Sequence, residues 1–281
     1  MRVLTPTSLD HALELLDEHR TEQVRPVAGG TDLLVSWHHH DKSDWTLLDL
    51  SPLAGELRSM QFADECLELG PLVSYWDVIR DDQVSGSFPL LRDAARQVGA
   101  VQIQTRGTWA GNIANGSPAA DGVPVMMAYD ASVVLASKSG RRQVSLDSYY
   151  TGYRKSVKRP DELIVSIRLP RRERDVEWFC KVGPRAAQAI TKVGVALTHD
   201  AAGWRVVVNS VAPTVLRCTA LEQALDAGAT FADPCEISAL LQHEIAPIDD
   251  MRSTAEYRGE ALARLLHHAL SEPPMIRACS A

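Results

Sequence analysis

The sequence predicts an α+β protein of two domains, and three observations support this fold class. The chain has 281 residues, of which 45% are hydrophobic and 23% charged, which is enough for two globular cores. Residues 24–50 follow the order strand, glycine turn, helix and strand, which is typical of a βαβ unit. Beyond residue 175 a run of strands precedes a run of helices, the arrangement of an α+β domain.

The first elements follow from the N-terminal segment. Residues 7–10 (TSLD) have the spacing of a capping box, and Leu9, Leu13 and Leu16 then share one helical face. The βαβ unit predicts strands at 24–28 and 45–50, with a helix at 33–37 between them.

The middle of the chain contains one long segment without a hydrophobic period. Residues 99–122 are rich in Gly, Asn, Thr and Ser, so we expect a loop, and long loops inside compact domains are usually functional. Around it the sequence predicts strands at 57–62, 66–69, 132–136, 143–146 and 163–169, and helices at 74–80, 88–98 and 119–128. A basic stretch at 154–159 leads into the last of these strands.

The charged segment 171–175 (RRERD) is the expected domain boundary, dividing residues 1–171 from 172–281. After it the sequence predicts strands near 177–182, 189–198 and 204–212, and helices starting near residues 216, 234 and 253.

Charge and cysteine content exclude several classes of protein. Lys+Arg 29 against Asp+Glu 36 gives a net charge of -7, which argues against a nucleic-acid-binding surface. The five cysteines form no CxxC pair and are odd in number, as in a reduced, intracellular chain, and they predict no zinc or iron–sulfur site. The N-terminus lacks a secretory signal and no apolar stretch is long enough to cross a bilayer, so we expect a cytoplasmic protein without membrane insertion.

Two glycine-bearing loops are the strongest candidates for a binding site. The common motifs GxGxxG, GxxxxGK[ST], HExxH and GxSxG are all absent. In residues 28–32 (AGGTD) the glycines allow a ligand to approach the backbone closely, and residues 108–117 (TWAGNIANGS) offer a second set of hydroxyl, amide and backbone donors. Together the loops favour a nucleotide whose pyrophosphate is held from both sides, although each loop alone is also consistent with a plain turn.

At these loops the sequence resembles the FAD-binding (medium) subunits of molybdenum hydroxylases, such as carbon monoxide dehydrogenase, 4-hydroxybenzoyl-CoA reductase and xanthine dehydrogenase. The matching segments are 28–33 (AGGTDL), 106–121 (RGTWAGNIANGSPAAD), 161–167, 181–193 and 252–258. The resemblance implies a vanillyl-alcohol-oxidase/PCMH-type FAD-binding domain of two α+β subdomains, at about 1–53 and 54–171, followed by a smaller α+β C-terminal domain.

The resemblance also implies the cofactor-binding residues. One side of the diphosphate would be surrounded by Val27, Ala28, Gly29, Gly30, Thr31, Asp32 and Leu33, and the other by Thr108, Trp109, Ala110, Gly111 and Asn112. Asp121 would accept hydrogen bonds from a ribose or ring donor, and Val98, Ile164 and Lys181 match positions that line the flavin or adenine. A lysine near the flavin N1–C2=O edge would stabilise the anionic reduced form.

The chain departs from the family pattern at Trp109 and Ala110, where an aliphatic residue and a glycine are usual. The indole would either pack on the cofactor or fill the core. Other conspicuous side chains have structural interpretations: His38, His39 and His40 as a solvated loop, His267 and His268 as a helix surface or C-terminus, and Cys180 as a small core residue.

By this resemblance the chain would be the FAD-carrying electron-transfer subunit of a larger hydroxylase. A small [2Fe–2S] subunit would deliver single electrons, a large molybdopterin subunit would oxidise the substrate, and NAD+, oxygen or a quinone would accept the electrons. No catalytic acid or base and no metal ligand is expected on this chain. Two alternatives remain at this stage: a self-contained flavin oxidase or dehydrogenase of the same fold, and a non-catalytic nucleotide-binding module.

Overall fold

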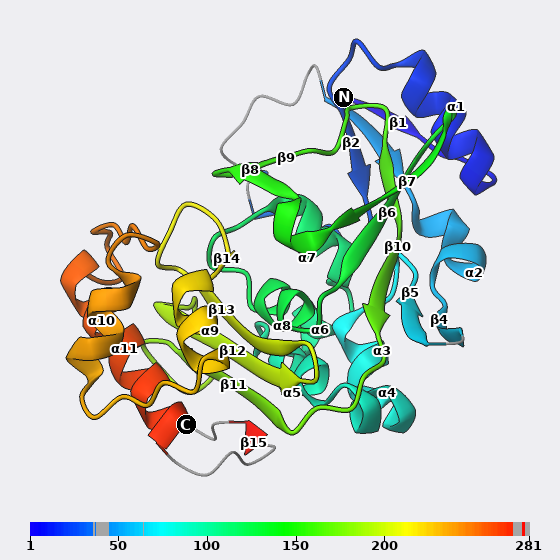
Figure 1. The fold of residues 1–281 in the computed structure, drawn as a ribbon. Coiled ribbons are helices and arrows are strands. Elements are labelled where there is room, and N and C mark those ends of the chain that lie inside the picture. Colours follow the sequence, from blue (N-terminus) through cyan, green and yellow to red (C-terminus); the bar gives the residue numbers. More distant parts are fainter. Residues whose placement is uncertain (36, 38–44, 64, 272–276, 279–281) are drawn as a thin grey trace.

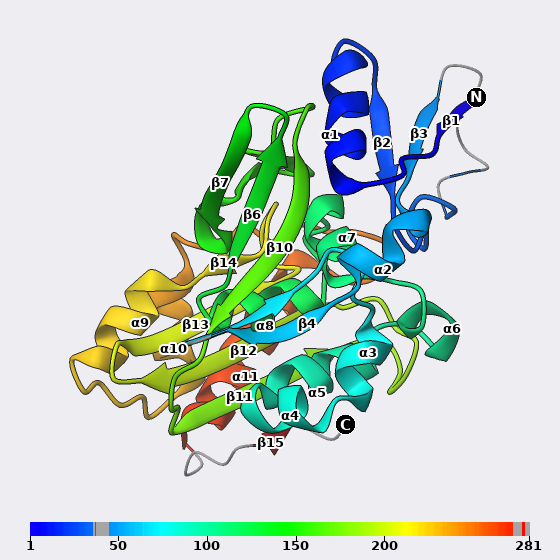
Figure 2. The same cartoon turned by 90° about the vertical axis from the view of Figure 1, so that its right-hand side faces the viewer.

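The computed structural model describes residues 1–35, 37, 45–63, 65–271 and 277–278, which are organised around three sheets and a small hairpin (Figure 1). The first sheet is parallel, with the order β1 (Arg2–Leu4), β3 (Thr46–Asp49) and β2 (Val24–Val27). Helix α1 (Leu9–Glu18) lies between this sheet and strand β6 of the second sheet (Figure 2). Its buried Leu9, Leu13 and Leu16 confirm the predicted apolar face.

The second sheet is antiparallel and forms the centre of the molecule, with the order β4-β5-β10-β6-β7. Its strands are β4 (Met60–Ala63), β5 (Cys66–Leu69), β10 (Leu163–Pro170), β6 (Ser132–Ser137) and β7 (Gly140–Ser145). The helices of this part are α2 (Ala54–Leu57), α3 (Tyr75–Arg80), α4 (Asp82–Ser87), α5 (Pro89–Gln97), α6 (Val101–Gln104), α7 (Trp109–Asn115) and α8 (Gly122–Ala128). The hairpin consists of β8 (Tyr150–Gly152) and β9 (Lys155–Ser156).

The third sheet has the order β14-β13-β12-β11-β15 and carries helices on both faces. Its strands are β14 (Leu216–Arg217), β13 (Gly203–Asn209), β12 (Val193–Asp200), β11 (Val176–Val182) and β15 (Arg277–Ala278). On one face Ala196 and Val207 join the core that contains α5 and α8, and on the other Val195 and Val208 pack with the C-terminal helices. Those helices are α9 (Thr219–Asp226), α10 (Pro234–Leu241) and α11 (Ala255–Ser271).

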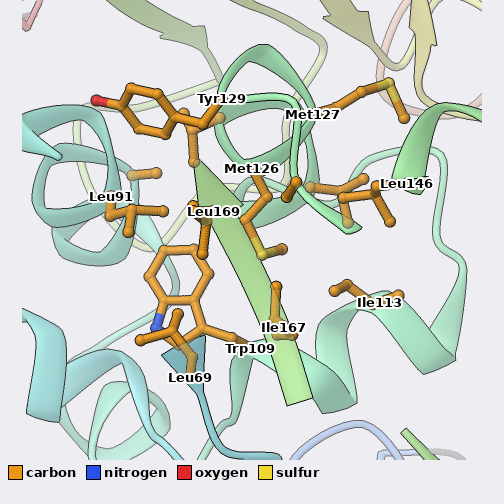
Figure 3. Packing of buried hydrophobic residues seen from close by; sticks show 14 of the residues in the cluster. Leu69, Leu91, Trp109, Ile113, Met126, Met127, Tyr129, Leu146, Ile167 and Leu169 are labelled. Atoms are coloured by element: carbon orange, nitrogen blue, oxygen red, sulfur yellow. The ribbon is translucent and has the colours of Figure 1, made fainter. Parts of the chain in front are cut away.

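The main hydrophobic core continues across the predicted boundary at residues 171–175. Trp109, Ile113 and Met126 from α7 and α8 pack against Ile167 of β10 (Figure 3), and Phe179 of β11 belongs to the same cluster. The C-terminal segment is therefore not joined by a mere linker, because it shares buried apolar surface with the rest of the chain.

The structure corrects the sequence prediction at two places near the glycine loops. The helix predicted at 33–37 is wrong at residues 33–35. These residues belong to a turn over residues 31–35, in which Leu34 and Val35 are exposed. A segment without a buried apolar face has no packing energy to hold a helix. The predicted loop at 99–122 is also wrong, since it contains α6 and α7, and the buried pair Trp109 and Ile113 provides the helical spacing.

Smaller corrections concern the ends of elements. Ser8, and not Thr7, caps α1, because its side chain accepts a hydrogen bond from the His11 N–H at 3.1 Å. Strand β12 begins at Val193, four residues later than predicted at 189, and α9 begins at Thr219. Strand β1 was not predicted. Cys180 is buried in β11 as expected, His267 and His268 lie on α11, and His38, His39 and His40 lie outside the described residues.

Candidate functional site

A cavity of about 600 Å³ lies where β2, the start of α7 and the start of β10 meet. Such a volume suits a cofactor-sized ligand. All of the predicted site residues except Trp109, Asp121 and Lys181 line this cavity. The structure therefore brings together two loops that are far apart in the sequence, together with Val98 and Ile164 from separate elements.

The two glycine loops are in direct contact with each other. A Cβ atom at Gly29 would overlap the backbone carbonyl of Arg106, and one at Gly107 would lie 3.4 Å from the Thr31 hydroxyl. Only a residue without a side chain fits at Gly29 as the backbone stands. The glycines are thus required for the apposition of the loops as well as for access to the cavity.

The first loop exposes backbone donors as it leaves β2. The Val27 carbonyl accepts the Leu50 N–H at 3.0 Å, after which Gly30 adopts a φ of 69° and its carbonyl accepts the Leu34 N–H at 2.9 Å. Within the described residues, the N–H groups of Gly29 and Gly30 donate to no protein acceptor. Donors of this kind at the wall of a cavity suit an anionic group.

The second loop enters the cavity as the first turn of α7. Thr108 caps this helix, accepting the Gly111 N–H on its hydroxyl at 3.0 Å and the Asn112 N–H on its carbonyl at 3.0 Å. The Asn112 Oδ1 atom is buried and has no hydrogen-bond partner among the described residues. This oxygen faces Gly122, where an added Cβ atom would lie 2.9 Å from it, and not the open space of the cavity.

Trp109 lies beneath the cavity and not on its wall. Its indole is fully buried and meets the Tyr75 ring edge-on, with centroids 4.9 Å apart, among the core residues seen in Figure 3. Tyr75 itself lines the cavity, so the indole supports a cavity residue from behind. Of the two interpretations of Trp109, filling the core is the one that the side-chain packing supports.

Asp121 and Lys181 form a buried ion pair next to the cavity. Lys181 Nζ lies 2.6 Å from Asp121 Oδ2 and 2.9 Å from the Gln97 carbonyl, and the Thr191 hydroxyl donates to the other carboxylate oxygen. Burial raises the pKa of Asp121, while Lys181 and Thr191 act in the opposite direction. This network links β11 of the C-terminal part to the start of α8.

Several residues of the cavity wall were missed by the sequence analysis. They include Tyr75, Arg154 and Lys158. The basic stretch at 154–159 was a visible signal for the last two, but nothing in the sequence shows that the hairpin carries them to the cavity.

Comparisons with known proteins identify the family to which this fold belongs. The α+β fold with two apposed glycine loops first defines the class, a protein that binds a nucleotide-like cofactor. The model for the FAD-binding domain in molybdopterin dehydrogenase matches residues 1–172, and that for the CO dehydrogenase flavoprotein C-terminal domain matches residues 178–272. The chain belongs to this family of FAD-binding medium subunits of molybdenum hydroxylases, and FAD is its cofactor.

Similar proteins agree with this family over nearly the whole chain. A xanthine dehydrogenase FAD-binding subunit of Escherichia coli O157:H7 is 28% identical, covering 94% of this chain and 93% of the relative. The caffeine dehydrogenase subunit beta of Pseudomonas sp. (strain CBB1) is also 28% identical, over 95% of this chain and 92% of its own. A solved structure of carbon monoxide dehydrogenase from Hydrogenophaga pseudoflava matches with a TM-score of 0.89 at 26% identity, covering 97% of this chain and 96% of its own.

These relatives make the chain a subunit of an oxidoreductase. No helix in the described part of the chain is long and apolar enough to cross a membrane.

Proposed function

We propose that this chain holds FAD in the cavity between its two glycine loops and relays electrons from a [2Fe–2S] subunit to NAD+, oxygen or a quinone, while a molybdopterin subunit oxidises the substrate. The observation that carries the proposal is the direct apposition of Gly29 and Arg106 at the wall of a cavity of about 600 Å³. Bound flavin would supply the exchange between one-electron and two-electron transfer.

The protein's own part is to bind and orient the cofactor. The free N–H groups of Gly29 and Gly30 would donate to the diphosphate, with the start of α7 on its other side. Val98 and Ile164 would provide apolar walls. Lys181, held by Asp121, would place a positive charge near the flavin, which favours added negative charge on reduction.

The division of labour among subunits has support from the sequence. Clusters of the [2Fe–2S] type need grouped thiolates, and the five cysteines of this chain are scattered. Similar chains are named as subunits or medium chains, and one of the solved structures that match is a carbon monoxide dehydrogenase.

The test is reconstitution of the purified full chain with FAD, followed by mixing with the co-purifying iron–sulfur and molybdopterin subunits. We expect the protein to keep its flavin absorbance after gel filtration. We also expect the substrate of the complex to bleach this absorbance only when the partner subunits are present. Turnover of alcohols or aldehydes by the isolated chain would favour a self-contained oxidase instead. Failure to retain flavin would leave only the nucleotide-binding alternative.

A further inference from the structure

The cavity carries more positive charge than the rest of the molecule would suggest. The chain as a whole has a net charge of -7. On the described cavity wall, however, Arg25, Arg154 and Lys158 are cationic and Asp32 is the carboxylate. Tyr75 is also there, but burial raises its pKa, so the phenol is neutral. An excess of cations around a cavity in an acidic protein points to an anionic ligand.

Arg154 reaches this wall from the turn between β8 and β9. The hairpin is fixed on α7, because the Tyr150 hydroxyl donates to the Ile113 carbonyl at 3.1 Å and a Cβ at Gly116 would lie 3.3 Å from the Arg154 Cα. Arg154 has a φ of 52°, which is unfavourable for a bulky residue and is found at functional sites. None of the ion pairs found among the described residues includes Arg154, whose guanidinium carbon lies 5.9 Å from the centre of the Tyr153 ring.

Lys158 follows on the same segment and also lacks a carboxylate partner. Its Nζ donates to the carbonyls of Arg159 at 3.0 Å and Glu162 at 2.9 Å. An ammonium group has three N–H donors, so the third can donate to a ligand. The Glu162 carboxylate is engaged elsewhere, by two hydrogen bonds from Arg142 at 2.7 and 2.9 Å. Burial lowers the pKa of Lys158, and the charges of the Glu162 and Asp161 carboxylates act in the opposite direction without contacting its Nζ.

We propose that Arg154 and Lys158 form a cationic wall that binds the diphosphate of FAD, in addition to the backbone donors of the glycine loops. This inference rests on the proposed function and deepens it, because the wall would make the cavity discriminate FAD from riboflavin, which has no phosphate. Charge-assisted hydrogen bonds to phosphate are among the stronger polar contacts in proteins, and they depend on the charge of the ligand.

The test measures the dissociation constants of FAD, FMN and riboflavin for the apoprotein, the full chain freed of flavin, by fluorescence titration. Arg154→Asn removes the charge and keeps a residue that tolerates positive φ. Lys158→Met removes the second charge, and Lys155→Gln is the matched control, because Lys155 is exposed on β9 and is not part of the cavity wall. Each of the first two variants should weaken FAD binding about tenfold, or about 1.4 kcal/mol, and leave riboflavin binding and the FAD affinity of the control unchanged.

If Arg154→Asn and Lys158→Met bind FAD as tightly as the wild type, the two cations do not bind the diphosphate. The proposed function would still stand. Equal weakening of FAD and riboflavin would also overturn the cationic wall, because damage to the cavity would then explain the loss. Thermal unfolding of each variant identifies such damage independently. A wild-type chain that binds none of the three flavins would instead overturn the proposed function itself.

Discussion

At the scale of single residues, close backbone contact decides more about the site than side-chain chemistry does. Gly29 meets the Arg106 carbonyl so closely that no Cβ fits between the loops, and Gly30 stands in the left-handed region. These two residues were predicted from the sequence as places of ligand approach. Their role in holding one loop against the other became visible only in the structure.

A first prediction follows for Gly29→Ala. The added methyl group has to push the loops apart, because its neighbour is backbone and not a flexible side chain. We expect FAD affinity to fall at least about tenfold, equivalent to about 1.4 kcal/mol, measured as the dissociation constant and as the ratio of flavin to protein after purification. Gly55→Ala on α2 is the control, since nothing lies within 4 Å of a Cβ there. Full flavin content in Gly29→Ala would contradict this placement of the loops.

A second prediction concerns the buried pair of Asp121 and Lys181. Lys181→Met removes the charge that compensates the carboxylate, and breaking a buried pair in this way typically costs about 3–5 kcal/mol in unfolding free energy. Burial would then raise the pKa of Asp121 further, so the variant should lose stability as pH rises through that raised pKa and regain it at lower pH.

Chemical denaturation at several pH values measures this effect. The second substitution Asp121→Asn should restore part of the stability of Lys181→Met, because it removes the uncompensated charge. A variant Lys181→Met as stable as the wild type at every pH would show that the pair contributes nothing to folding.

At the scale of elements, α7 joins the core to the cofactor cavity. Its buried face contains Trp109 and Ile113, and its first turn presents Gly111 and Asn112 to the cavity. From its glycines and amides this segment was predicted to be a loop. The helix forms because Thr108 caps its first turn and the apolar pair is buried, and burial depends on the tertiary structure.

A third prediction follows for Thr108→Ala, which removes the cap of α7. A lost N-cap costs about 1 kcal/mol of unfolding free energy, and here the freed Gly111 N–H also lies at the cavity. We expect this variant to lose both stability and FAD affinity. Ser8→Ala removes the equivalent cap of α1, which is not an element of the cavity wall, and should lose stability alone. If Thr108→Ala and Ser8→Ala bound FAD with similar affinity, α7 would not be part of the FAD-binding site.

At the scale of the whole molecule, one continuous core unites segments that the family models treat separately. Phe179 and Val207 from the third sheet belong to the same cluster as Trp109 and Ile167. Across this contact the Tyr129 hydroxyl donates to the buried Glu177 at 2.7 Å and accepts the Leu90 N–H at 3.1 Å. The C-terminal part thereby supports the helices behind the cavity.

A fourth prediction concerns the acid stability of the whole chain. Burial works to raise the pKa of Asp250, but hydrogen bonds and charges from Arg252 and Arg258 prevail and lower it from 3.8 to about 2. A lowered pKa in the folded state gives stability that is present above pH 3.8 and is lost as pH falls toward about 2.

Asp250→Asn should therefore be less stable than the wild type near neutral pH, with a shallower loss of stability in acid. Equilibrium unfolding as a function of pH measures both slopes. Arg264→Gln, at an exposed pair with Glu260 on α11, is the control and should keep the wild-type slope. If the unfolding free energy of the wild type and of Asp250→Asn fell equally steeply in acid, Asp250 would not contribute to the acid stability of the chain.

The sequence by itself determined the family, the cofactor, and the two glycine loops, because these depend on local residue identities such as Gly29, Gly30 and Gly111. The α+β class and most strands also followed from local periodicity. Only the tertiary structure decided which residues share the cavity, that Trp109 lies in the core and that Arg154 and Lys158 stand on the wall. Those contacts join distant parts of the chain, and hydrophobic burial and backbone packing fix them only once the chain is folded.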